Sequence, residues 1–121
     1  MKGVTIDPAK QTAQARTGHT AEEILAATAT HSLAPVLGEC GTVGAGLALG
    51  GGLGWLSGKY GAASDNVLGT RIITADGHTL KTDASTNEDL FWAIRGGGGN
   101  FGIATLLEYK LHPVGHPIVL M

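Results

Sequence analysis

The stretch from residue 38 to residue 61, GECGTVGAGLALGGGLGWLSGKYG, carries the residues best suited to chemistry. It holds half of the chain's 20 glycines, its only cysteine, and just two charged side chains, Glu39 and Lys59. An ordered glycine costs backbone entropy, so this density indicates a need for close backbone approach or for positive φ angles. We interpret the stretch as a surface against which a flat cofactor lies, with Cys40 inside it.

Two alternative roles for these glycines are open. Gly44-Ala-Gly46 suggests a Rossmann turn, with Asp65 where a ribose-binding acid is expected. The third glycine would fall at Leu49, however, and residues 34–42 contain a proline and polar residues where a buried strand should lie. A P-loop is excluded because no Gly-Lys-Ser/Thr is present. The plainer alternative is that the glycines only allow tight turns to pack, with Cys40 as a small buried hydrophobe.

The remaining residues capable of chemistry favour structural roles. Asp65 and Asn66 are expected to cap and turn. His112 and His116 lie four apart around a proline with no third ligand near them, so no metal site is expected. Arg95 is expected to form a salt bridge at a helix end or to offset the helix dipole. We expect the remaining histidines (His19, His31, His78) to be solvated and the large aromatic residues to be in the core: Trp55, Tyr60, Phe91, Trp92 and Tyr109.

Short elements must position the glycine-rich stretch. Strand-like segments separated by turn residues predict strands over residues 4–7 and 12–17. Thr20 and Glu23 form a capping box for a helix over residues 21–30. Short helices are expected over residues 43–49 and 55–60, the second closed by Gly61.

The second half of the chain contains the clearest hairpin. Residues 67–75 and 78–82 flank Asp76-Gly77, which supplies the positive φ angles of a type I′ turn. Thr86 and Asp89 are expected to cap a helix over residues 87–95 that Gly96 stops. Residues 101–111 predict a final strand ended by Pro113. Together these elements predict an α+β fold with a mostly antiparallel sheet flanked by helices.

Composition limits the classes of protein to which the chain can belong. Its 121 residues are 43% hydrophobic with a net charge of -2, which is typical of one globular domain or part of one. No block of like charge is present, so neither nucleic acid nor a membrane is an expected partner. A single cysteine excludes an internal disulfide. The start, MKGVTIDPAK, lacks the apolar stretch of a signal peptide, which slightly favours a cytoplasmic location.

Several spaced motifs carry a resemblance to a known family. They are GECGTVGAGLALGGGLGWLSGKYGAASDN, then RIITADG, then EDLFWAIRGGGGNFGIATLLEYKLHPVG. From about residue 4 to residue 115 the chain resembles the second half of the FAD-binding (PCMH-type) domain of vanillyl-alcohol-oxidase-type flavoproteins, in the berberine bridge enzyme-like branch. The order of the motifs makes the match far more specific than any single glycine pattern.

The resemblance implies a two-lobed flavin domain with FAD between the lobes. Residues 1–115 would be a partial FAD-binding domain, the end of the first lobe plus the second lobe, and residues 116–121 a linker or tail. The family's pyrophosphate loop with its flavin-linking histidine has no counterpart here, nor does the C-terminal substrate domain with its catalytic base. We therefore name no catalytic residue in this chain.

The family motif maps onto particular residues. Gly38-Glu-Cys-Gly-Thr-Val-Gly44 is similar to the context in which a cysteine bonds to C6 of the flavin, so Cys40 is the candidate for covalent attachment to FAD. Thr42, Val43, Gly44 and Gly46 would place a hydroxyl and backbone amides against the diphosphate, ribityl or pyrimidine part. The further expected cofactor contacts are Leu37, Gly38, Ala48, Gly52 and, at the adenine, Ile103.

The resemblance implies two alternatives for function. In the first, the chain is the FAD-binding part of an FAD-dependent oxidase that transfers hydride from a substrate C–H bond to flavin, with reoxidation by O2. In the second, the chain is a catalytically silent fragment or half-domain that needs a partner chain, a missing lobe or dimerisation to bind FAD. A small-molecule substrate would belong to the complete enzyme.

Overall fold

One antiparallel sheet forms the base of the molecule. In the computed structural model, which describes residues 1–115, the strands lie in the order β1 (Val4–Asp7), β2 (Thr12–Arg16), β6 (Ile103–Pro113), β4 (Val67–Ile73) and β5 (Thr79–Asp83). A short strand that the sequence did not predict, β3 (Leu33–Pro35), pairs with the end of β6. Every described pairing is antiparallel, which confirms the predicted fold class. The expected tail and His116 lie outside the described residues.

Strand β6 is the centre of the sheet because it pairs with three other strands. Tyr109 lies opposite Ala13 of β2 and Val67 of β4. Alternate side chains of β6, Leu107, Tyr109 and Leu111, are almost completely buried. The period of two therefore directs one face of β6 into the core, and burial raises the pKa of the Tyr109 hydroxyl above its ordinary value.

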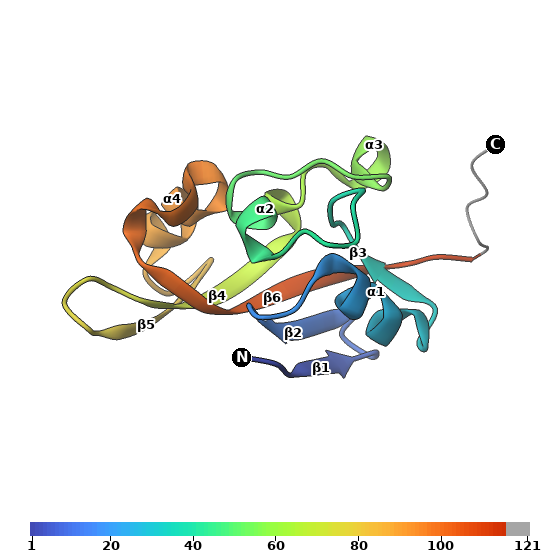
Figure 1. Ribbon diagram of the computed structural model, residues 1–121, viewed down its shortest axis with the longest axis horizontal. Coiled ribbons are helices and arrows are strands. Elements are labelled where there is room, and N and C mark those ends of the chain that lie inside the picture. Colours follow the sequence, from blue (N-terminus) through green and yellow to red (C-terminus); the bar gives the residue numbers. More distant parts are fainter. Residues whose placement is uncertain (116–121) are drawn as a thin grey trace.

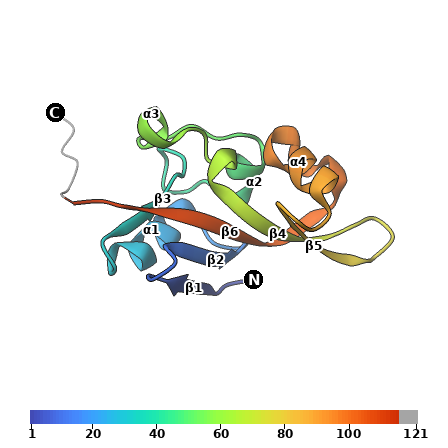
Figure 2. The same ribbon diagram turned by 180° about the vertical axis from the view of Figure 1, so that it is seen from behind.

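Helices cover one face of the sheet (Figure 1; Figure 2 gives the reverse view). They are α2 (Ala45–Leu49), α3 (Ser57–Tyr60) and α4 (Glu88–Gly97), with the 3₁₀ turns η1 (Ser64–Asn66) and η2 (Gly98–Phe101). Helix α1 (Ala21–Ala29) packs beside β3 and β1. Phe91 and Ile94 of α4 and Ala48 of α2 join Leu107 and Tyr109 in a single hydrophobic cluster. No helix among residues 1–115 is long and apolar enough to cross a membrane.

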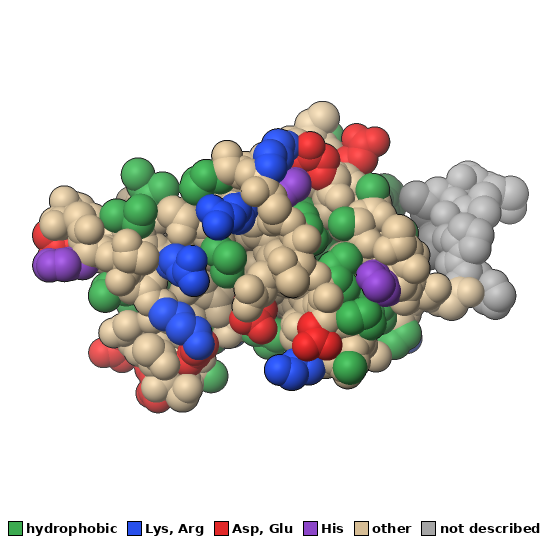
Figure 3. Space-filling model, turned by 90° about the horizontal axis from the view of Figure 1, so that it is seen from below, with side chains coloured by type: hydrophobic (Ala, Val, Ile, Leu, Met, Phe, Trp, Pro, Cys, Tyr) green, Lys and Arg blue, Asp and Glu red, His purple; other side chains and the backbone are tan. Residues whose placement is uncertain are grey.

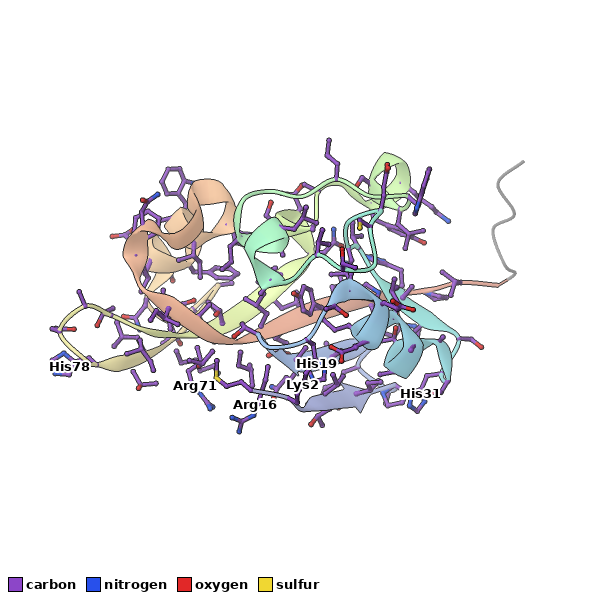
Figure 4. All side chains as sticks on the ribbon, in the orientation of Figure 1. Lys2, Arg16, His19, His31, Arg71 and His78 are labelled. Atoms are coloured by element: carbon purple, nitrogen blue, oxygen red, sulfur yellow. The ribbon has the colours of Figure 1, made fainter. Side chains whose placement is uncertain are left out.

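The opposite face of the sheet carries charged side chains (Figure 3). The strand register places Arg16, Leu106, Arg71 and Lys81 in one row across four strands. Arg16 and Arg71 project from this side of the sheet, away from the helices (Figure 4). The sheet therefore separates a charged face from the helical layer.

The capping box of α1 forms as predicted. Thr20 Oγ1 accepts from the Glu23 amide at 3.4 Å, and the Glu23 carboxylate accepts from the Thr20 amide at 2.9 Å. Hydrogen bonds from the Lys2 ammonium and the Thr20 amide hold the pKa of Glu23 at about 2. His19 is not solvated, contrary to expectation: its side chain is 13% exposed, and its Nε2 accepts from the Gly3 amide at 2.6 Å.

The predicted hairpin forms, but its turn is not type I′. Gly77 has a φ of +84°, whereas Asp76 is not among the residues with positive φ. The Gly77 amide donates to the Thr74 carbonyl, and the Thr74 amide donates to the His78 carbonyl, each at 2.9 Å. These bonds close a three-residue loop, which takes a type I turn followed by a left-handed glycine.

The predicted cap of α4 is also wrong. Its N-cap is Asn87, in the left-handed region at φ 49°, because Thr86 is engaged in a bridge with Asp83. The Asn87 side chain donates to the Lys81 carbonyl at 2.7 Å, and asparagine tolerates this backbone conformation better than most residues. At the other end, Gly96 has a φ of 120° and stops the helix as expected.

Candidate functional site

Residues 37–54 form a ribbon that leaves the end of β3, includes α2 and leads to α3 (Figure 1); we call it the glycine ribbon. Its inner side rests on the core. Leu37, Gly38, Val43, Gly44 and Ala48 line a cavity of about 10 Å³ together with Tyr109 and its neighbours. A cavity of that size is at the lower limit for one water molecule. Any cofactor must therefore lie on the outer side of the ribbon.

Some glycines of the ribbon are required by the fold. A Cβ at Gly54 would lie 1.7 Å from the Leu37 carbonyl oxygen, and a Cβ at Gly38 would lie 2.6 Å from a Leu47 methyl group. Gly52 has a φ of +78°, which side chains rarely adopt. Tight packing and backbone conformation therefore account for these three positions.

Gly44 and Gly46 are not required in this way. Among residues 1–115, a Cβ at Gly46 would meet no atom of another segment within 4 Å, and one at Gly44 would meet only the His19 carbonyl, at 3.8 Å. Neither residue has a positive φ. Gly44 is the N-cap of α2, a position that glycine suits, whereas Gly46 lies inside α2, where glycine costs up to about 1 kcal/mol relative to alanine. These positions leave backbone uncovered on the outer side of the ribbon, and such a surface fits the flat cofactor expected from the sequence.

Cys40 lies at the surface and not in the core. Its thiol is exposed, and its Sγ lies 3.0 Å from Thr42 Oγ1. Hydrogen bonds from the Thr42 hydroxyl and amide lower the pKa of the Cys40 thiol. The thiolate is the reactive form of cysteine, so an exposed thiol with a lowered pKa is well placed for attack on an electrophile.

The ten predicted site residues differ in exposure and in place. Cys40, Thr42, Gly44 and Gly46 are exposed on the ribbon, whereas Gly38 and Ala48 are buried and Leu37, Val43 and Gly52 are partly buried. Ile103 begins β6, beside Ile73 of β4, with 68% of its surface exposed. Figure 1 places the start of β6 and the 37–44 segment at opposite ends of the helical layer, with α2 between them. A ligand that touches both Ile103 and the 37–44 segment must therefore be elongated.

Two aromatic residues expected in the core are exposed. Trp55 is 59% exposed and Trp92 is 77% exposed, whereas Phe91 and Tyr109 are buried as predicted. Leu53, in the ribbon, is 73% exposed, and Trp55 follows the ribbon directly. The end of the ribbon thus carries a small apolar surface in addition to the open glycines.

A buried polar contact fixes helix α3, to which the ribbon leads. His112 of β6 stacks on Tyr60 of α3, with ring centroids 3.7 Å apart, and its Nε2 lies 2.7 Å from Asn66 Oδ1. The Asn66 amide group donates to the carbonyls of Tyr60 and Ala62. His112 is thus a buried packing residue, and among residues 1–115 no group of His, Cys, Asp and Glu could hold a metal ion.

Comparison with known proteins identifies related chains. The family described as FAD binding domain matches residues 1–83. (R)-6-Hydroxynicotine oxidase of Paenarthrobacter nicotinovorans is 41% identical over 93% of this chain, which covers 25% of that protein. The FAD-linked oxidoreductase pgmH of Aspergillus terreus is 40% identical over 95% of this chain, and the match covers 24% of the length of pgmH. The chain therefore spans about a quarter of the length of the curated relatives it matches.

Solved structures give the same result for the fold. The crystal structure of 6-hydroxy-D-nicotine oxidase from Arthrobacter nicotinovorans superposes with a TM-score of 0.91 at 40% identity, over 93% of this chain and 25% of that one. A BBE-like protein from Physcomitrella patens superposes with a TM-score of 0.90 at 35% identity, over 95% of this chain and 26% of the Physcomitrella protein. These values confirm the predicted antiparallel sheet with helices.

Proposed function

Because the chain belongs to the FAD binding domain family of vanillyl-alcohol-oxidase-type, BBE-like flavoproteins, we propose that its glycine ribbon is the surface that holds the flavin part of FAD. The observation that carries this proposal is the open backbone at Gly44 and Gly46 beside the exposed thiol of Cys40. Side chains are missing there although neither packing nor the φ angle requires glycine. The space is consistent with a flat ring that approaches the main chain.

Each predicted residue then has a distinct task. Cys40 and Thr42 stand at the flavin ring, with Cys40 as the candidate for a thioether bond to the ring carbon C6. Such a bond would replace the S–H and C6–H bonds, and O2 would accept the two electrons and two protons that are released. Gly44 and Gly46 let the cofactor touch the backbone, whereas Leu37, Gly38, Val43, Ala48 and Gly52 shape the ribbon from within. Ile103 offers its backbone to the adenine end. Bound FAD would supply the electron acceptor, because an isoalloxazine ring takes up two electrons and a proton.

We further propose that the chain serves in an FAD-dependent oxidase, in which hydride passes from a substrate C–H bond to the flavin and O2 reoxidises it. Residues 1–115 would be the end of the first lobe and the second lobe of the FAD-binding domain. The chain's own part is to orient the flavin and to stabilise negative charge on the reduced ring through backbone donors. We assign no catalytic acid or base to it.

Visible absorbance tests FAD binding, and acid precipitation tests its covalent attachment. The purified chain is incubated with FAD, freed of unbound flavin, examined for flavin absorbance and then precipitated with acid, which releases noncovalent flavin. We expect yellow colour to stay in the pellet of the wild type and to leave the pellet of Cys40→Ala. A wild-type chain that takes up no FAD at all would overturn the proposal for this chain.

The second candidate is a half-domain that needs a partner to bind FAD, either a missing lobe or a second copy. Leu53 in the ribbon and Trp55 directly after it favour this candidate, because exposed apolar side chains mark a surface that another lobe or chain can cover. Light scattering tests the second copy: a dimer that Trp55→Ser converts to monomer supports it, and a wild-type monomer at high concentration contradicts it. The matched control is Trp92→Ser, since Trp92 is an equally large exposed side chain that lies in α4, away from the end of the ribbon.

A further inference from the structure

A second hollow lies at the end of α4, apart from the glycine ribbon. It has a volume of about 420 Å³ and is lined by the last turns of α4, from Trp92 to Gly97, together with Phe101 and Asp65. None of residues 37–54 lines it. Its volume falls within the range of small-molecule sites.

Arg95 lines this pocket without a polar partner. It makes no hydrogen bond or ion pair with any residue from 1 to 115, so the expected salt bridge does not form there, and its Nε is buried with no acceptor. Its guanidinium carbon lies 4.3 Å from the centre of the Phe91 ring, so the ring supports one face of the group. The terminal nitrogens keep their donors free. A guanidinium has five N–H donors in a planar fork that suits a carboxylate.

Aromatic rings form the walls of the pocket. Trp92 is 77% exposed and Phe101 is 37% exposed, which is unusual for such large apolar side chains. A Cβ at Gly97 would lie 2.7 Å from the Phe101 ring, so glycine at this position lets Phe101 lie against the loop. The rings offer flat apolar surface next to the one positive group.

The charge of the pocket selects among anions. Arg95 supplies one positive charge, and Asp65 supplies a carboxylate whose Oδ2 is held by the Ala62 amide at 3.0 Å. Asp65 repels any anion in the pocket, and at the same distance it repels a doubly charged phosphate about twice as strongly as a singly charged carboxylate, which disfavours phosphate. We propose that this pocket binds an aromatic monocarboxylate, with the carboxylate on Arg95 and the ring against Trp92 and Phe101.

The chain's two tryptophans make a selective test possible. In Trp55→Phe, Trp92 is the remaining tryptophan, so its fluorescence reports on the pocket. This variant is titrated with benzoate, with the neutral isostere benzamide, and with inorganic phosphate. We expect saturable quenching by benzoate, with benzamide and phosphate at least about tenfold weaker, since a hydrogen bond to a charged group is commonly worth that much. Equal binding of benzamide, or tighter binding of phosphate, would overturn the proposal.

Variants of Arg95 then test whether its guanidinium is the donor to the carboxylate. Arg95→Gln in the Trp55→Phe background should weaken benzoate binding at least about tenfold, whereas Arg71→Gln, on the opposite face of the sheet, should leave it unchanged. Circular dichroism verifies the fold, and Arg95→Lys, which keeps the charge, should bind with intermediate strength. Unchanged benzoate binding in both Arg95 variants would overturn the assignment. So would competitive displacement of benzoate by FAD, because the pocket would then belong to the cofactor surface.

Discussion

The sulfur of Cys40 lies 3.0 Å from the hydroxyl oxygen of Thr42, on the exposed side of a glycine ribbon whose other side is closed against the core. The contact joins two residues of the family motif. It gives the thiol a polar neighbour that stabilises its ionised form. The reactive thiol of the ribbon therefore faces away from the core.

Removal of the Thr42 hydroxyl should slow the reaction of Cys40. The hydrogen bonds from Thr42 lower the pKa of the thiol, so Thr42→Val should raise that pKa and reduce the thiolate fraction near neutral pH. Alkylation by iodoacetamide, followed by mass spectrometry as a function of pH, should give a curve displaced to higher pH. Thr5→Val is the matched control, because Thr5 is exposed on β1. Superimposable curves for Thr42→Val and the wild type would rule out this role.

Two glycine-to-alanine variants should separate the fold from cofactor binding. At Gly46 the new methyl group enters open space inside a helix, so Gly46→Ala should keep stability or raise it by up to about 1 kcal/mol. At Gly54 it would meet the Leu37 carbonyl at 1.7 Å, so Gly54→Ala should be severely destabilised. Thermal unfolding measures both. Only the Gly46 variant should lose FAD binding while remaining folded, and a folded Gly46→Ala chain with wild-type FAD binding would contradict the proposed contact.

His112 should make stability depend on pH. Burial, assisted by the charges of Lys110 and Lys59, lowers the pKa of His112 in the folded chain. As pH falls below about 6.5, the unfolded chain takes up a proton that folded His112 does not, so the free energy of unfolding falls until the pH reaches the folded pKa. Above about 6.5 this contribution is constant. Urea unfolding measured between neutral and mildly acidic pH should show a lower free energy of unfolding at the acidic end.

The matched variant for that experiment is His112→Gln. It should cost about 1–3 kcal/mol at neutral pH, because Asn66 Oδ1 loses a well-placed partner and Tyr60 loses its stacked ring. The difference in free energy of unfolding between His112→Gln and the wild type should become smaller as pH falls. A constant difference across the range would mean that His112 titrates normally.

The start of α1 should be sensitive to a single hydroxyl. Thr20→Ala removes the acceptor for the Glu23 amide and should cost about 1 kcal/mol. Thr5→Ala is the control. Equal melting temperatures for the two variants would show that the capping box adds nothing measurable.

The sequence predicted most elements because local signals were strong and agreed with one another. Thr20 and Glu23 marked the start of α1, and the Asp76-Gly77 dipeptide marked the hairpin. The type of that turn was missed because loop length, set by where pairing ends, decides between type I′ and a three-residue loop. Strand β3 was missed because three residues carry little periodicity, and it exists through pairing with β6.

A candidate site could be proposed from residue types, but the roles of its glycines could not be separated. Gly46 and Gly54 look alike in the sequence, and only the atoms around each position distinguish an open backbone from a crowded one. The exposure of Trp92 and the lack of a polar partner for Arg95 among residues 1–115 were also hidden from sequence reasoning. Both depend on what the rest of the chain places beside the end of α4.

The most direct measurement is the alkylation rate of Cys40 with and without FAD, followed by mass spectrometry of the Cys40 peptide. If FAD lies against the ribbon, it should slow alkylation saturably in the wild type, AMP alone should not, and Gly46→Ala should lose the protection. A sulfur that reacts equally fast at every FAD concentration would contradict the claim that this surface holds the flavin.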